Sequence, residues 1–261
     1  MEQKQARPFL RGKPADSRTL RTAAGIFGAL LLTCFLNLIL TGTAATLKAV
    51  WLRVGFCLLQ EGAYCALFFY SGQSRGAGDV ALGETMLARR ESGRPGTPAE
   101  EARCWHPTKG FVQAFLGTVP FLILTIVYAF LAERQRMTPG ALPSWVSGMS
   151  SRPDVTEPLT VYTIAEPAKL GDYLRVGVRM LIMPFVTVVG AQNFDPMLTL
   201  ERLAPVLSLL PAASYGTGYI LGVGARRRVH ENIAEGQKRL QKKQRREKRQ
   251  KQREREPEQL N

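Results

Sequence analysis

Polar and charged side chains interrupt two long apolar stretches of this sequence at helical spacing. Asn37 lies in the first stretch, and Arg53, Gln60 and Glu61 lie in the second. Because lipid offers no hydrogen-bond partner, such groups must face one another or a water-filled cavity. Two interpretations of this intramembrane polar seam stay open. It is either a path for a substrate or protons, or a structural seam of interhelical hydrogen bonds and ion pairs.

Arg53 is the most demanding member of this seam, since an unpaired charge at membrane depth is unfavourable. We expect it to pair with Glu61 or with Asn37. Arg53 and Glu61 are eight residues apart in the sequence, which is about 12 Å along an ideal helix. A partner on the neighbouring helix is therefore favoured over a pair within one helix.

A second polar run extends from Gly190 to Pro196 and contains Gln192, Asn193 and Asp195. Proline disfavours helix at the residue before it. The run therefore predicts either an unwound segment that lines a transport site or an ordinary interfacial turn.

Residues that could catalyse a reaction or hold a cofactor form no recognisable set. Cys104 and His106 are close in sequence, but two ligands fall short of the four of a structural zinc site. The other histidine, His230, is far away in the sequence. The four cysteines form no Cys-x-x-Cys pair, and phosphate-binding glycine loops and zinc-protease patterns are absent. We predict no catalytic residue, no metal site and no cofactor, and we expect that the protein is not an enzyme.

Basic residues are concentrated at the two ends of the chain. Residues 226–261 hold fourteen Lys/Arg and six Glu, a net charge of +8, and residues 1–21 add a net +4 to a total of +14. Charge that is concentrated in the tails gives information about what the tails bind and little about the fold. We predict that the C-terminal tail binds a polyanion, either anionic lipid headgroups or RNA, including ribosomal RNA. The alternative is a solvated tail that only fixes membrane orientation. The predicted binding residues are Arg226, Arg227, Arg228, Lys238, Arg239, Lys242, Lys243, Arg245, Arg246, Lys248 and Arg249.

Five apolar stretches are candidates to cross a bilayer core of about 30 Å, which takes about 20 residues. Arg179, near the start of the fourth stretch, is close enough to its end to snorkel to the interface. The first stretch is longer than the apolar region of a signal peptide, roughly 7–15 residues, so we expect a retained span. The predicted spans are residues 23–47, 49–70, 111–132, 176–200 and 203–224.

The segments between and after these spans carry weaker signals. Thr97 and Glu100 form a capping-box pattern that predicts a helix start inside a loop at 71–110. Residues 133–175 contain five prolines and predict an irregular connector. The tail is rich in good helix formers, and we expect a solvated helix that Gly236 and Pro257 interrupt or end. Gly218-x-x-x-Gly222 predicts close packing on a neighbouring helix, with self-association as the alternative.

Together these features predict an all-α protein, a polytopic transmembrane helix bundle of about five spans (range four to six) with a basic helical tail. The predicted domains are a basic segment at 1–22, a transmembrane domain at 23–224 and a cytoplasmic tail at 225–261. Lys/Arg-rich segments prefer the cytoplasm, but five spans would place the two basic ends on opposite sides. An even number of spans would place both inside.

The function most consistent with this sequence is that of a non-enzymatic, multi-pass scaffold or accessory protein of the cell membrane. Its basic tail would engage a polyanionic partner. The alternative is a small-solute or ion transporter, or a transporter subunit, with Arg53, Glu61 and Asp195 near the substrate path. A membrane-embedded enzyme is a third class, but we identify no set of residues that supports it. The first two differ in whether Arg53 and Glu61 face a cavity or are sealed against each other.

Overall fold

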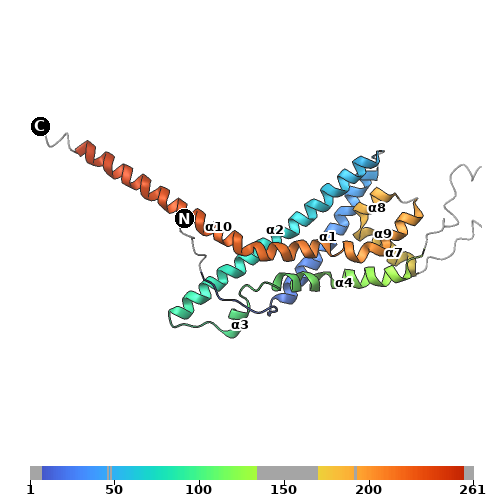
Figure 1. The fold of residues 1–261 in the computed structure, drawn as a ribbon, viewed down its shortest axis with the longest axis horizontal. Helices are drawn as coiled ribbons and strands as arrows, with labels where there is room; N and C mark the ends of the chain where they lie inside the picture. Colours follow the sequence, from blue (N-terminus) through green and yellow to red (C-terminus); the bar gives the residue numbers. More distant parts are fainter. Residues whose placement is uncertain (1–7, 46, 48, 134–169, 191–192, 256–261) are drawn as a thin grey trace, which may run out of the picture. The chain divides into compact units, whose positions relative to one another are not determined.

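The computed structural model describes residues 8–45, 47, 49–133, 170–190 and 193–255. Every regular element within these residues is a helix, which confirms the predicted all-α fold (Figure 1). Residues 134–169, the greater part of the predicted irregular connector, lie outside the described residues. The helices are α1 (Thr19–Ala45), α2 (Val50–Glu91), α3 (Pro98–Ala102), α4 (Lys109–Leu131), α7 (Leu170–Leu181), α8 (Met183–Val189), α9 (Phe194–Leu207) and α10 (Leu210–Arg255).

Among the described residues, four helical stretches are long and apolar enough to cross a membrane. They are Thr19–Thr41, Val50–Glu91, Lys109–Leu131 and Phe194–Arg249. The first and third correspond to the predicted spans at 23–47 and 111–132. Neither of these contains a charged residue or more than one proline. The number four lies at the lower end of the predicted range, and the chain is built as a multi-pass membrane protein.

The predicted span at 176–200 is wrong as a single helix. Three short helices, α7, α8 and α9, replace it. Pro184 lies in the first turn of α8, where its missing N–H is tolerated, but its ring excludes a continuous helix from the preceding turn. Gly190 then ends α8 with a φ angle of +81°, a conformation that side chains other than glycine rarely adopt.

Two helices are longer than a bilayer requires. α2 has 42 residues and α10 has 46, or about 63 and 69 Å at 1.5 Å per residue. The predicted loop at 71–110 is therefore wrong as far as Glu91, because the polar residues there continue α2. The predicted helical tail is present, but Gly236 does not interrupt it, since one glycine costs a helix only about 1 kcal/mol relative to alanine. Pro257 lies outside the described residues.

The predicted capping box is confirmed at the start of α3. The Thr97 hydroxyl accepts a hydrogen bond from the Glu100 N–H, and the Glu100 carboxylate accepts one from the Thr97 N–H at 3.0 Å. These two bonds satisfy backbone donors that the helix itself cannot. They allow a helix of only 5 residues to form between α2 and α4.

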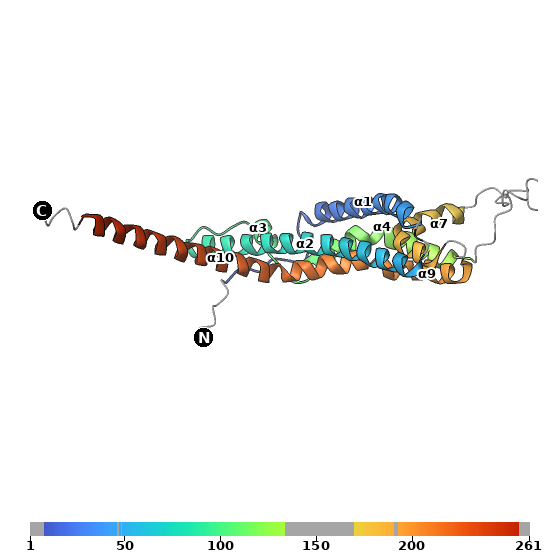
Figure 2. The same ribbon diagram turned by 90° about the horizontal axis from the view of Figure 1, so that it is seen from above.

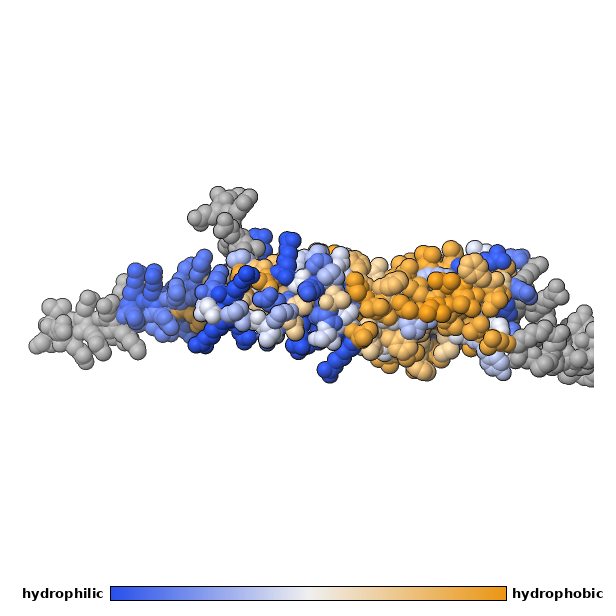
Figure 3. Space-filling view, turned by 90° about the horizontal axis from the view of Figure 1, so that it is seen from below, coloured by the Kyte–Doolittle hydropathy of each residue, from blue (hydrophilic) through white to orange (hydrophobic). Residues whose placement is uncertain are grey.

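The chain divides into two compact units, which are described separately. We call them the membrane unit and the polar unit, because hydrophobic side chains dominate the surface of the first and hydrophilic ones that of the second (Figure 3). The membrane unit comprises residues 20–67 and 113–213, and the polar unit comprises residues 1–19, 68–112 and 214–261.

The membrane unit has a small apolar core and a larger apolar surface. Val178, Ile182 and Met197 are at most 1% exposed and form part of the core between α7, α8 and α9. Leu32 and Phe130, in contrast, are mostly exposed. An extensive exposed apolar surface is typical of a protein in contact with lipid.

The four candidate spans predict that both ends of the chain lie on the same side of the membrane. Basic segments favour the cytoplasm, so we expect reporters fused to each end to read as cytoplasmic. Of the two connections on the opposite side, the first is short and contains only Lys48 as a basic residue. The second is longer than roughly 60 residues, the length up to which basic residues in a loop influence its side of the membrane. Reporters on opposite sides would show an odd number of spans.

Candidate functional site

In the polar unit, α2 and α10 lie side by side and run in the same direction (Figure 2). Glycines make this contact: Gly76 of α2 meets Gly222 of α10, and Gly72 of α2 meets the backbone of Tyr215 and Tyr219. A Cβ atom on Gly218 would lie 2.0 Å from the carbonyl oxygen of Phe69. The predicted close packing of Gly218-x-x-x-Gly222 on a neighbouring helix is confirmed. Its partner on α2 was missed, because the sequence placed that segment in a loop.

A buried lysine lies at the start of α4 in the same unit. The ammonium of Lys109, which is 1% exposed, lies 2.7 Å from Asp16 Oδ2 and 3.3 Å from Asp79 Oδ2. It also donates to the carbonyl oxygens of Arg103 at 2.7 Å and Cys104 at 3.4 Å. The two carboxylates offset a positive charge at a helix N-terminus, where the helix dipole disfavours it.

Tyr219 extends this arrangement to α10. Its hydroxyl donates to Asp79 Oδ2 at 2.6 Å, and its carbonyl oxygen accepts from Trp105 Nε1 at 3.4 Å. The ring lies directly over the backbone of Gly110, where a Cβ atom would be 2.4 Å from the Tyr219 Cβ. Lys109, Asp16, Asp79 and Tyr219 form what we call the Lys109 cluster, which joins the N-terminal segment, α2, α4 and α10.

The charge balance within the Lys109 cluster changes the acidity of Asp16. Burial opposes ionisation of this carboxyl, but the hydrogen bond and the charge of Lys109 outweigh it. The N–H of Arg18 and the hydroxyl of Thr19 add further hydrogen bonds. Together they lower the pKa of Asp16 below its ordinary value of 3.8. Asp16 is therefore an anion at every ordinary pH.

A second ion pair joins α10 to α2 at the base of the tail. Arg226 donates to Glu84 Oε2 through Nε at 3.1 Å and Nη2 at 2.9 Å, and His230 Nε2 lies 2.8 Å from Glu84 Oε1. Arg226, a predicted polyanion-binding residue, thus binds within the protein. Arg227 pairs with Glu231 one turn further along, at 3.3 Å.

The other predicted tail residues are exposed along α10. Within the described residues none of them forms an ion pair, so their charges are available to a partner. These residues are Arg228, Lys238, Arg239, Lys242, Lys243, Arg245, Arg246, Lys248 and Arg249.

In the membrane unit, α1 and α2 form part of the predicted polar seam. Gln60 Nε2 donates to Asn37 Oδ1 at 2.5 Å and to the Tyr64 hydroxyl at 3.3 Å. Asn37 and Gln60 are buried. The structure therefore brings together two of the four predicted seam residues, on the helix faces that their spacing indicated.

The expected pairing of Arg53 is wrong. Its Nη1 donates to the carbonyl oxygen of Thr187 in α8 at 3.4 Å, and not to Asn37 or Glu61. Thr187 lies in the last turn of α8, where carbonyl groups have no partner within the helix. The break at Gly190 thus creates an acceptor that the guanidinium uses.

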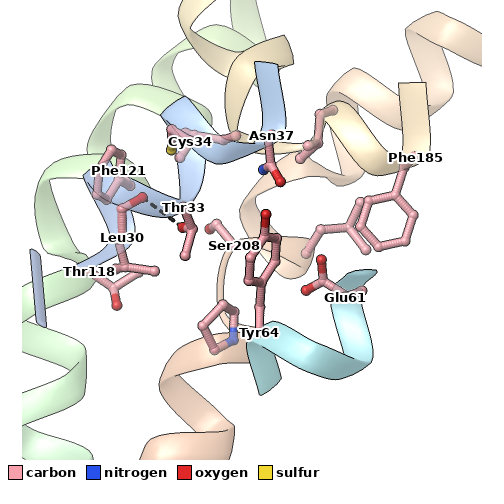
Figure 4. Close-up of a pocket in the computed structure, with 14 residues that line it drawn as sticks. Leu30, Thr33, Cys34, Asn37, Glu61, Tyr64, Thr118, Phe121, Phe185 and Ser208 are labelled. Atoms are coloured by element: carbon pink, nitrogen blue, oxygen red, sulfur yellow. Dashed lines mark hydrogen bonds between the residues drawn. The ribbon is translucent and has the colours of Figure 1, made fainter. Parts of the chain in front are cut away.

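Glu61 instead lines a small pocket that is partly open to the surroundings of the unit. Glu61 and Tyr64 enter it from α2, and Cys34 and Asn37 lie along its α1 side (Figure 4). Within the described residues, no hydrogen bond or ion pair reaches the Glu61 carboxylate. Arg53 is not among the lining residues.

Another carboxylate of the membrane unit is fully paired. Glu201 of α9, 1% exposed, accepts hydrogen bonds from Arg179 Nε at 2.7 Å and from the Tyr128 hydroxyl at 3.0 Å. Arg175 Nε lies 3.7 Å from the same carboxylate and also donates to the Tyr128 hydroxyl. Arg179, which was expected to snorkel, instead pairs with a buried acidic partner within the unit.

Sequence reasoning missed this group of four residues, although one signal was present. Arg175 and Arg179 are one helical turn apart, so both side chains point to the same side of α7. Glu201 is the acidic residue that precedes an apolar stretch. Only the break between α7 and α9 brings these groups together.

The remaining predicted candidates lie elsewhere. Cys104 is buried, and the His106 ring contacts the Thr108 hydroxyl at 2.9 Å near the start of α4. Asp195 lies exposed in the first turn of α9 and does not line the pocket. Gln192 lies outside the described residues. No group of three potential metal ligands occurs within the residues that the structure describes.

Comparison with known protein families, curated proteins and solved structures finds no match. Function is therefore inferred from the residues of this chain and their geometry.

Replacing Lys109 with methionine should destabilise the protein strongly, because it leaves Asp16 and Asp79 without their shared cation. Removal of one partner from a buried pair typically costs about 3–5 kcal/mol. We expect a lower melting temperature of the purified protein in detergent, measured by tryptophan fluorescence.

Two variants control this experiment. Lys13→Met removes an exposed lysine of the same unit and should leave the melting temperature unchanged. Combining Lys109→Met with Asp79→Asn should restore part of the loss, because one unpaired carboxylate is removed. Equal melting of the Lys109 and Lys13 variants would contradict the structural role of the cluster.

The lowered pKa of Asp16 predicts a pH dependence. Its ionised form is favoured in the folded state, so its contribution to stability is complete above its ordinary pKa of 3.8 and is lost as pH falls through the lowered value. The difference in melting temperature between the natural protein and Asp16→Asn should stay constant from pH 7 to about pH 5 and shrink below pH 3.8. A difference that already shrinks near neutral pH would show that Lys109 does not hold this carboxylate.

Proposed function

We propose that this protein is a non-enzymatic membrane scaffold that holds a polyanion, RNA, at the cytoplasmic face of the cell membrane. The binding element is the part of α10 from Lys238 to Arg249. The observation that carries the proposal is that this basic segment lies in the same helix, α10, as the end of an apolar stretch long enough to cross a membrane.

The exposure and density of charge support this role. The segment from Lys238 to Arg249 contains eight Lys/Arg and one Glu, and each of its basic side chains is exposed. Phosphate groups attract such residues without sequence preference. Arg226 is excluded from the binding set, because Glu84 already holds it at the base of the tail.

The distribution of charge around α10 favours RNA over a lipid surface. At about 100° per residue, the eight basic side chains occupy roughly 220° of the helix circumference. A helix that lies on a membrane needs a continuous apolar face opposite its charges, and Leu240 is the single large aliphatic residue in this segment. Phosphates that surround a helix, as in a folded RNA, can contact most of such an arc.

The segment also indicates how RNA would be bound. It contains no aromatic residue on which bases could stack. Contact with the phosphate backbone is therefore the expected mode, and binding should depend strongly on salt. A pre-formed helix reduces the entropy lost on binding, because fewer side chains and no backbone have to be ordered.

The proposal is tested with the full-length protein in nanodiscs of neutral lipid and a fluorescent structured RNA. Each phosphate contact contributes about −0.7 to −0.9 to the slope of log K against log salt concentration. Changing Lys238, Arg239, Lys242 and Lys243 together to glutamine removes four basic side chains. It should make the slope less negative by about 3 and weaken binding at every salt concentration.

The matched control changes Gln237, Gln241 and Gln244 to alanine, which alters the same helical segment without changing its charge. Its slope should equal that of the natural protein. Anionic vesicles provide the second arm. Absence of RNA binding near 0.15 M salt, with or without binding to the vesicles, would overturn the proposal. Vesicle binding alone would assign the tail to lipid headgroups.

A further inference from the structure

Two glutamates in the apolar helices of the membrane unit differ in whether their carboxylates have hydrogen-bond partners. Glu201 is enclosed by two arginines and a tyrosine hydroxyl. Glu61, near the middle of the apolar part of α2, lines a pocket and receives no hydrogen bond or ion pair from the described residues. A carboxylate at membrane depth without a protein partner is costly, and such groups commonly mark binding sites or ion paths.

Three of the other polar groups of the pocket offer acceptor oxygens, whereas the Tyr64 hydroxyl and the Asn37 amide, which both accept from Gln60, keep O–H and N–H donors. The hydroxyls of Thr33, Thr118 and Ser208 each donate their proton to a carbonyl oxygen three or four residues earlier, at 2.7–2.9 Å. Their oxygen lone pairs therefore remain for the pocket. A ligand that suits these oxygens and a carboxylate has to supply several N–H or O–H donors.

The rest of the lining is apolar and aromatic. Leu30, Phe121 and Phe185 contribute walls around the polar groups (Figure 4). Pro211 also lines the pocket. Among the lining residues that the structure describes, Glu61 is the one charged residue, so its ionised form gives the pocket a negative charge. Aromatic rings add attraction for a cation that lies over their faces.

We propose that this pocket binds the ammonium group of a protonated primary amine that carries a hydrocarbon body. Glu61 pairs with the ammonium, the oxygens of Thr33 and Ser208 accept from its N–H groups, and the apolar walls enclose the hydrocarbon. A quaternary ammonium ion fits less well, because it has the charge but no donors. This site is independent of the proposed RNA-binding tail, since all its residues belong to the membrane unit.

A set of ligands of similar size separates these contributions. The probes are 2-phenylethylammonium, the neutral 2-phenylethanol and the quaternary 2-phenylethyltrimethylammonium. Binding to the full-length protein in neutral nanodiscs is measured by equilibrium dialysis, with protein-free nanodiscs as the background. We expect saturable binding of the primary amine, at least tenfold tighter than that of the alcohol and tighter than that of the quaternary ion.

The Glu61→Gln variant keeps the shape of the side chain and removes its charge, so it should weaken amine binding at least tenfold. Glu91→Gln, at the exposed end of the same helix, is the matched control and should bind as the natural protein does. If Glu61→Gln fails to fold, the comparison of the three ligands on the natural protein is sufficient to test the proposal. Equal binding of amine and alcohol, no saturable binding, or a folded Glu61→Gln variant that retains amine affinity would overturn the proposal.

Discussion

The polar unit is organised by the need to neutralise one buried ammonium group. Lys109 is almost inaccessible to water, and an isolated charge in such a place is strongly disfavoured. Two carboxylates and two carbonyl groups meet that need, and they come from the N-terminal segment, α2 and the turn before α4. Tyr219 links α10 to this group, because its hydroxyl donates a hydrogen bond to Asp79. Segments that are distant in sequence must therefore assemble together, because each alone would leave a charge unpaired.

Glycine and charge have complementary roles in this assembly. The glycines of α2 and α10 allow the two backbones to touch, but small residues alone permit several registers along a helix. Tyr219 on Asp79 and Arg226 on Glu84 select one of them, because each side chain reaches its acidic partner only in this arrangement of the two helices. The tail therefore leaves the unit from a defined position.

Local sequence features predicted the elements that local interactions determine. The spans at 23–47 and 111–132 contain no charged residue, so apolar length alone identified them. That polar faces of the first two spans meet was expected, because helical spacing places polar residues on one face and lipid requires them to pair, but Asn37 was assigned to Arg53 and not to Gln60. The capping box at Thr97 was identified for a similar reason, since both of its hydrogen bonds lie within four residues.

What depends on pairing between distant segments was not predicted. Residues 71–91 look like a loop because they are rich in glycine and charge, yet those residues make the helix contacts with α10. The stretch at 176–200 looked continuous by hydropathy, which does not register the steric effect of Pro184. Once that stretch breaks, Thr187 offers a carbonyl to Arg53, and α7 turns Arg179 toward Glu201. Neither partner can be deduced from hydropathy or from spacing within one helix.

The contrast between the paired and the unpaired carboxylates gives the membrane unit its functional interest. The same break that supplies Arg179 to Glu201 also folds α7, α8 and α9 into the wall of the Glu61 pocket. Arg53 lies only eight residues from Glu61 in sequence, but it binds α8, and no cation among the described residues pairs with that carboxylate. The two charges lie too far apart along α2 for a direct pair. Glu61 is directed into the pocket, which is the placement that the proposed cation site requires.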